Sequence, residues 1–268
     1  MENKIRVTIW NEFRHEKTDE KARELYPNGL HATIGEFLTK DPEIEVTLAA
    51  LDDPDQGLPP EVLNNTDVLI WWGHMAHGEV NDELVTRIQR RVLLGHMSFI
   101  ALHSAHHSKP FRAIVGTTGN LTGGRKEREI LGNFLPNHPI AEGIPQSFFI
   151  ESEELYAEPF FVPQPTELIF GAWYEDGYIF RAGMTYLRDA GKVFYFQPGH
   201  ETCPSFHNPY VQRIITNAVH WARPIRPGYE IHDFCPHPVN NYDALAEQGK
   251  LKKNMCYPVK TQLGIDDK

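Results

Sequence analysis

Short apolar runs that alternate with helical patterns constrain the fold of this chain more than any other feature. Residues 67–72 (DVLIWW) and 99–102 (FIAL) have the composition of strands that are buried on both faces of a sheet. Between them, residues 83–94 carry apolar side chains at helical spacing. A strand, a helix and a second strand in this order form a right-handed unit with parallel strands. The sequence therefore predicts an α/β fold with a parallel sheet.

The same rhythm extends over most of the chain. The expected strands are residues 5–10, 44–50, 67–72, 99–102 and 192–197, with shorter, mixed strands at 147–150, 167–173 and 177–180. The expected helices are residues 31–39, 83–94 and 210–221. We expect one domain over residues 1–223 and a Pro-rich extension over residues 224–268. Such an extension could clasp a second subunit, so a homo-oligomer is the expected state.

Charge and composition argue against several classes of partner. The formal net charge of −10 disfavours nucleic acids and anionic membranes, because both need basic patches on the protein. The sequence contains no run of about 18 apolar residues, the length that a membrane-spanning helix needs, and its N-terminal residues do not have the pattern of a signal peptide. The three cysteines include no C-x-x-C pair, which disfavours a disulfide framework and favours the cytoplasm. Because the sequence has neither a Walker loop nor a G-x-G-x-x-G turn, we expect no nucleotide cofactor.

Histidines and acids follow four of the expected strands. The chain has 14 histidines, a high content for 268 residues. The polar and glycine residues after the first, third, fourth and last long strands are Asn11, Glu12 and His15; Gly73, His74 and His77; His103, Ser104, His106 and His107; and Gly199, His200 and Glu201. Ligands of open α/β sheets bind at the carboxyl ends of the strands. The sequence therefore predicts a functional site at this edge.

Two histidine motifs each allow a functional and a structural interpretation. GHMAHG (residues 73–78) has the H-x-x-H spacing of metal ligands, although loop histidines that only form hydrogen bonds share it. LHSAHH (residues 102–107) resembles the sharp turn between strand and helix on which some enzymes expose a nucleophile. In the functional interpretation Ser104 is the nucleophile of a hydrolase. In the structural interpretation its hydroxyl caps the following helix. The strict G-x-S-x-G pattern is absent, which favours the cap.

Acidic side chains near the expected cleft offer proton acceptors. FYFQPGHE (residues 194–201) ends a strand with His200 and Glu201, and this glutamate can orient the imidazole, bind a metal ion or cap the next turn. EELYAE (residues 153–158) places three glutamates in an expected loop. Glu154 is the best candidate among them for a general base or a metal ligand.

Seven motifs together resemble the ThuA-like family, which is named for trehalose utilisation. They are WNEFRHE, YPNGLH, WWGHMAH, LHSAHHSKPF, HPIAEGIP, EELYAE and FYFQPGHE, and they extend from about residue 4 to residue 223. The resemblance implies a flavodoxin-like three-layer sandwich with a mostly parallel central sheet, similar to class I glutamine amidotransferases. Those enzymes carry a cysteine at the turn that His103 and Ser104 occupy here, and Cys203 cannot reach that position. We therefore do not expect a glutaminase.

Without that cysteine, several imidazoles around one cleft are better suited to hold a divalent metal ion. Zn²⁺ is the first candidate, because it takes three protein ligands and leaves a position open for water or substrate. The expected ligands are His74, His103 and His200, with His31 and His77 in reserve. The expected catalytic side chains are His103, His200, Glu201, Glu154, His15 and Glu12.

The resemblance implies work on carbohydrates, namely on a trehalose-type disaccharide or a keto-sugar. A metal ion could polarise a sugar carbonyl while a carboxylate or an imidazole removes the adjacent proton. This layout fits proton transfer, elimination, isomerisation or hydrolysis. Two alternatives stay open: a non-catalytic sugar-binding or regulatory module, and a serine hydrolase that uses Ser104, His200 and Glu201.

Overall fold

The computed structural model describes residues 4–224, so nearly all of the expected Pro-rich extension lies outside the described residues. Within this range the strands are β1 (Ile5–Asn11), β2 (Ile44–Ala50), β3 (Val68–Trp72), β4 (Ser98–Leu102), β5 (Thr122–Asn133), β6 (Ser147–Ala157), β7 (Glu167–Tyr174), β8 (Ile179–Arg188) and β9 (Gly191–Phe196). The α-helices there are α1 (His15–Thr18), α2 (Glu20–Leu25), α3 (Leu30–Leu38), α4 (Pro60–Asn64), α5 (Asp82–Leu93), α6 (Lys109–Val115) and α7 (Pro209–Ala222). Short 3₁₀ turns occupy Pro54–Gly57, His77–Glu79, His103–His107, Pro139–Ala141 and Ser205–His207.

The strands form one mixed sheet in the order β2-β1-β3-β4-β9-β8-β7-β5-β6. The first five strands in this order are parallel, and the remaining four pairings are antiparallel. The α/β fold is as expected, but a mostly parallel sheet is not confirmed, since only half of the pairings are parallel. Only Asp189 and Ala190 connect β8 to β9, and so short a connection permits only an antiparallel pair.

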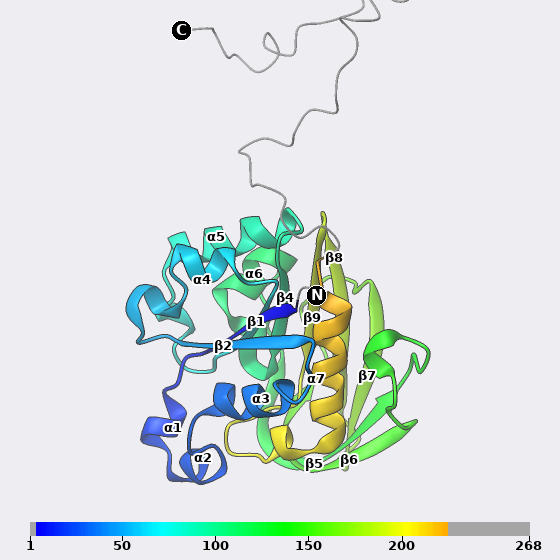
Figure 1. Ribbon diagram of the computed structural model, residues 1–268. Helices are drawn as coiled ribbons and strands as arrows, with labels where there is room; N and C mark the ends of the chain where they lie inside the picture. Colours follow the sequence, from blue (N-terminus) through cyan, green and yellow to red (C-terminus); the bar gives the residue numbers. More distant parts are fainter. Residues whose placement is uncertain (1–3, 225–268) are drawn as a thin grey trace, which may run out of the picture. The chain divides into compact units, whose positions relative to one another are not determined.

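Helices cover both faces of the parallel half of the sheet, as expected for three layers (Figure 1). Helix α7 contacts α3, β1, β4 and β9 on one face, and α5 and α6 pack together on the other. The strands between these layers are apolar because both of their faces are buried: every residue of β3 and β4 is buried. At the centre, the rings of Trp10 and Trp71 stack with centroids 3.7 Å apart.

The four strands that end in histidines or acids are neighbours in the sheet, in the order β1-β3-β4-β9. Their register pairs Asn11 with Trp72 and Trp72 with Leu102, so the carboxyl ends of β1, β3 and β4 align. Leu102 pairs in turn with Phe196, near the end of β9. The segments after these ends are thereby held side by side, and the candidate site is built there.

Two local expectations are wrong. The first five residues of EELYAE belong to strand β6, and their alternating side chains are therefore directed to opposite faces. The cap of helix α6 is Ser108, whose side chain accepts a hydrogen bond from the Phe111 amide. Ser104 instead donates its hydroxyl hydrogen to the carbonyl of Gly73 at 2.7 Å.

None of the helices in the described part of the chain is long and apolar enough to cross a membrane.

Candidate functional site

Side chains from the four strand ends and from β6 meet in one group, the histidine–glutamate cluster. Its members are His15, His74, His103, His200, Glu12, Glu154 and Glu201. The ring centroids of His74, His103 and His200 lie 5.4 to 5.7 Å from one another. The structure thus brings together the six expected catalytic residues and the three preferred metal ligands.

His103 is completely buried at the end of β4, with the unusual φ of +53°. Its Nδ1–H donates to the main-chain carbonyl of Gln197 at 2.9 Å, because a carbonyl oxygen can only accept. Its Nε2 lies 3.1 Å from Glu154 Oε2 and 3.2 Å from the Tyr156 hydroxyl. Burial lowers the pKa of His103, but the hydrogen bond to Glu154 and the charge of Glu153 outweigh it and raise this pKa overall. The hydrogen bond with Glu154 thus favours the protonated form of His103.

His200 lies on the loop after β9, and its Nδ1 accepts a hydrogen bond where the Nδ1 of His103 donates one. Its Nδ1 accepts a hydrogen bond from the backbone N–H of Thr202 at 3.1 Å. Its Nε2 lies 3.4 Å from Glu201 Oε1 and 3.8 Å from Glu154 Oε2. Burial and the neighbouring His103 lower the pKa of His200 to about 3. This imidazole is therefore neutral at pH 7.

Glu201 joins the two halves of the cluster. Its Oε2 accepts from His74 Nδ1 at 2.9 Å, and its Oε1 lies 3.5 Å from His15 Nε2. Burial would raise the pKa of Glu201, but the hydrogen bond from His74 and the nearby imidazoles lower it to about 2. His74 is the most exposed of the cluster's histidines, with 29% of its side chain accessible. A ligand can reach the cluster from this side.

Two buried glutamates hold the backbone around the cluster. Glu12 accepts from the amides of Met75 and Ala76 at 2.9 Å each; burial raises its pKa, but hydrogen bonds from His15 and these amides lower it to about 2. Glu153 accepts from the amides of Gly199 at 2.7 Å and His200 at 3.1 Å. An expected loop gives no reason to place Glu153 in the interior. In strand β6 the side chains alternate between the two faces, and Glu153 is fully buried.

Two overlapping groups in the described residues have the composition and spacing to hold a metal ion. One is His74, His103 and His200, and the other is His15, His74 and Glu201; within each, the donor atoms lie within 4.8 Å of one another. In metal sites, the second ring nitrogen of a ligating histidine donates to a carboxylate or a carbonyl. His103 and His74 have this arrangement through Gln197 and Glu201. These residues could therefore hold a metal ion.

The other proposed site residues lie outside these two metal groups. His31 contacts the Asn11 side chain at 3.1 Å through Nδ1. Burial lowers the pKa of His77 to about 4, and its buried Nε2 has no hydrogen-bond partner among residues 4–224. Glu158 pairs with Arg181 at 2.7 Å, away from the cluster. Ser104 is committed to the Gly73 carbonyl and has no histidine partner in the described range, which disfavours the serine hydrolase.

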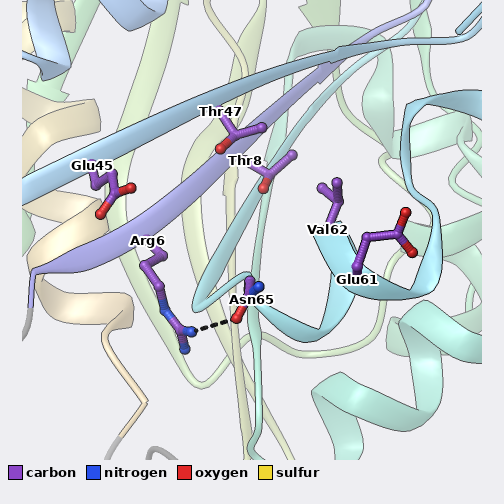
Figure 2. A pocket seen from close by; sticks show the side chains of 7 residues that line it. All are labelled: Arg6, Thr8, Glu45, Thr47, Glu61, Val62 and Asn65. Atoms are coloured by element: carbon purple, nitrogen blue, oxygen red, sulfur yellow. Dashed lines mark hydrogen bonds between the residues drawn. The ribbon is translucent and has the colours of Figure 1, made fainter.

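A separate hollow lies along the first halves of β1 and β2 (Figure 2). Its volume is about 450 Å³, and it is lined by Arg6, Thr8, Glu45, Thr47, Glu61, Val62 and Asn65. Arg6 donates to Asn65 at 3.1 Å and pairs with Asp67 at 2.6 Å, so its charge is already balanced. The hollow and the histidine–glutamate cluster have no residue in common.

One family model matches most of the chain. The family model described as trehalose utilisation, ThuA, matches residues 6–222. A ThuA-like protein from Parabacteroides merdae is similar in structure with a TM-score of 0.63 and 14% identity, over 87% of this chain and 95% of its own. A protein described as cytoplasmic from Salmonella typhimurium has a TM-score of 0.54 and 12% identity, over 81% and 99% of the two chains.

A glutamine amidotransferase from Thermotoga maritima matches at the lower TM-score of 0.46 and 11% identity, over 91% of this chain and 85% of its own. Comparison with curated proteins gives no significant match. At these identities the ThuA-like structure and the Salmonella structure show a shared fold with this chain.

Proposed function

Because the chain belongs to the ThuA family of trehalose utilisation, we propose that it is an enzyme of carbohydrate utilisation that acts on a trehalose-type disaccharide or a keto-sugar. The observation that supports an enzyme is the convergence of histidines and glutamates from four adjacent strand ends. A pocket that only bound a neutral sugar would need amide and aromatic side chains instead. The large aromatics near these ends do not supply such a surface, since Trp10, Trp71 and Trp72 are fully buried.

The cluster separates proton acceptors from proton donors. Glu154 is held as a carboxylate, because the hydrogen bond from His103 overcomes the effect of burial and lowers its pKa. His103 is oriented by Gln197 on one side and faces Glu154 on the other. Glu154 is thus placed to take a proton from a carbon next to a carbonyl group, and His103 positions it. The reaction is a proton transfer that leads to isomerisation, elimination or hydrolysis.

A divalent metal ion, with Zn²⁺ as the first candidate, is part of the proposal. His74 would hold it, together with either His103 and His200 or His15 and Glu201. When bound, such an ion polarises a carbonyl oxygen or activates a water molecule.

The test is the metal content of protein purified without a histidine tag, measured by inductively coupled plasma mass spectrometry. We expect about one equivalent of metal, lost in His74→Ala because His74 belongs to both metal groups. His220→Ala is the matched control, since His220 pairs with Asp41 at 2.8 Å on the surface and should keep the metal. Absence of bound metal after incubation with zinc, manganese and iron would contradict the proposal that the protein uses a divalent metal ion.

A non-catalytic sugar-binding or regulatory module is the second candidate. It would bind trehalose or a keto-sugar in calorimetry and leave the sugar chemically unchanged. We further propose a cytoplasmic location, since one structural neighbour is described as cytoplasmic, and a homo-oligomer. The proposed partners include neither nucleic acid nor membrane, in keeping with the net charge of −10.

A further inference from the structure

We infer that His200 presents a ring N–H to an oxygen of the substrate, and that it is not a metal ligand. The inference deepens the proposed function: it assigns the hydrogen-bond donor of the reaction and the ligand class that it binds, a sugar carbonyl. It rests on which nitrogen of each ring carries the proton.

Two donors converge on His200 Nδ1. One is the backbone N–H of Thr202, which can only donate, and the other is the Thr202 hydroxyl, each 3.1 Å away. Lys126 donates to that hydroxyl oxygen, which leaves the hydroxyl hydrogen directed toward Nδ1. Nδ1 therefore carries no proton. In a neutral imidazole the proton then resides on Nε2, the atom that faces the cluster.

His74 shows the reverse arrangement. Its Nδ1 faces the Glu201 carboxylate, which accepts a hydrogen bond, so in the neutral ring Nε2 carries the lone pair. Both nitrogens of His103 face acceptors, the Gln197 carbonyl and the Glu154 carboxylate, so His103 offers no lone pair while Glu154 is ionised. The group of His74, His103 and His200 therefore has one lone pair. The group of His15, His74 and Glu201 needs no contribution from His200, so it is the better place for a cation.

The Nε2–H of His200 lies between two carboxylates, 3.4 Å from Glu201 Oε1 and 3.8 Å from Glu154 Oε2, and both separations are longer than an ordinary N–H···O hydrogen bond. A donor next to a base fits a substrate that has a carbonyl oxygen and an acidic C–H on the adjacent carbon. A neutral imidazole can polarise such a carbonyl without giving up its proton. The matching substrate is a keto-sugar with a hydroxyl on that adjacent carbon.

The step balances without an oxidant. The Glu154 carboxylate removes the proton of the adjacent carbon, and the C–H electron pair forms a C=C bond while the carbonyl π electrons move to oxygen. The Nε2–H of His200 stabilises the resulting oxyanion. Return of the proton from Glu154 to the former carbonyl carbon, with transfer of the hydroxyl proton to the oxyanion, gives the isomeric keto-sugar.

The direct test is the tautomer of His200 in the wild-type protein, labelled with ¹⁵N-histidine and observed by long-range ¹H–¹⁵N correlation. His200→Gln assigns the signal. We expect Nδ1 without a proton and Nε2 protonated at pH 7, unchanged after one equivalent of Zn²⁺. A proton on Nδ1, or displacement of the Nε2 proton by zinc, overturns the inference. This readout needs neither turnover nor bound metal.

The kinetic test follows deuterium uptake from D₂O at the carbon next to the carbonyl of a keto-disaccharide made by oxidation of trehalose. His200→Ala should slow this exchange about 100-fold, as loss of one oxyanion donor does. His200→Gln, whose side-chain amide can donate in place of Nε2–H, should keep more of the rate. Equal rates in the two variants would overturn the role of the donor. No exchange in the wild type would instead refute the proposed proton transfer. The position of the proton on His200 would then be tested by the tautomer spectrum alone.

Discussion

Glu153 is a buried carboxylate that holds the loop of His200 in place. Oε1 accepts from the amides of His200 and Glu154, and Oε2 accepts from the Gly199 amide and the Ser205 hydroxyl. Glu153→Gln would turn one accepting oxygen into a donor that faces other donors. We expect the free energy of unfolding to fall by about 2 kcal/mol in urea titrations. Glu151→Gln is the control, because 76% of the Glu151 side chain is exposed, and it should change stability little; equal effects of the two variants would refute the role of Glu153.

Buried histidines predict how stability depends on pH. Among the described residues, the pKa is lowered for His31, His77, His96, His106, His107, His138 and His200. It is raised for His15 and His103 alone. Below pH 6.5 the unfolded chain therefore binds more protons than the native protein does, and stability is lost.

We expect the free energy of unfolding, measured with urea, to decrease steadily as the pH falls from 7 to about 5. Burial lowers the pKa of His77 to about 4, so His77→Gln should make this decrease smaller. Below pH 4.5, Glu12 and Glu201 add to the loss of stability. Their pKa is about 2 in the native protein and 4.5 in the unfolded chain, so the stabilisation from their charged forms is lost as the pH falls from 4.5 toward 2. Stability that rises on acidification would contradict these assignments.

At the residue scale, the strand-end rule located most of the cluster. His74, His103 and His200 each follow a recognisable apolar run, and the edge of a parallel sheet brings such positions together. The proton positions could not be predicted in this way. They depend on Gln197 and Thr202, main-chain partners whose orientation only the folded loop defines.

Among the elements, the loop between β9 and α7 depends on one glycine. Gly199 has a φ of +136°, and a Cβ there would lie 2.5 Å from the Phe206 ring. We expect Gly199→Ala to cost about 2 kcal/mol in urea unfolding and to disturb His200. Gly177→Ala separates the cost of backbone strain from the cost of the clash with Phe206. Gly177 has a φ of +83°, but a Cβ there would meet no atom within 4 Å, so this variant reports backbone strain alone. An equal cost for both variants would show that the contact with Phe206 does not matter.

The parallel strands and the long helices were predictable, with ends that differ by at most one residue. Their signal is local, since apolar runs and helical spacing survive in the sequence. Strand β5 was not predicted, because TGGRKEREILGN is highly charged and lacks the alternation of apolar and polar residues that indicates a strand. It is held by pairing with β6 and β7, and such tertiary context overrides local preference.

For the whole molecule, the testable expectation concerns assembly. If the Pro-rich extension clasps a second subunit, the full chain should have the mass of an oligomer in light scattering coupled to size exclusion, and a chain truncated after Arg223 should be a monomer. Urea unfolding of the truncated chain checks that its domain is intact. An oligomer that survives truncation would place the interface elsewhere, and a monomeric full chain would refute the homo-oligomer.

The position of β9 between β4 and β8 also affects how the chain matures on the ribosome. Strands β1, β3 and β4 are synthesised long before Gly191–Phe196, so β4 keeps an unpaired edge throughout the intervening synthesis. Closing so distant a pair costs loop entropy and slows folding. Nascent chains therefore carry His103 at the end of a strand with an unpaired edge, and such an edge favours aggregation until the last strand is inserted.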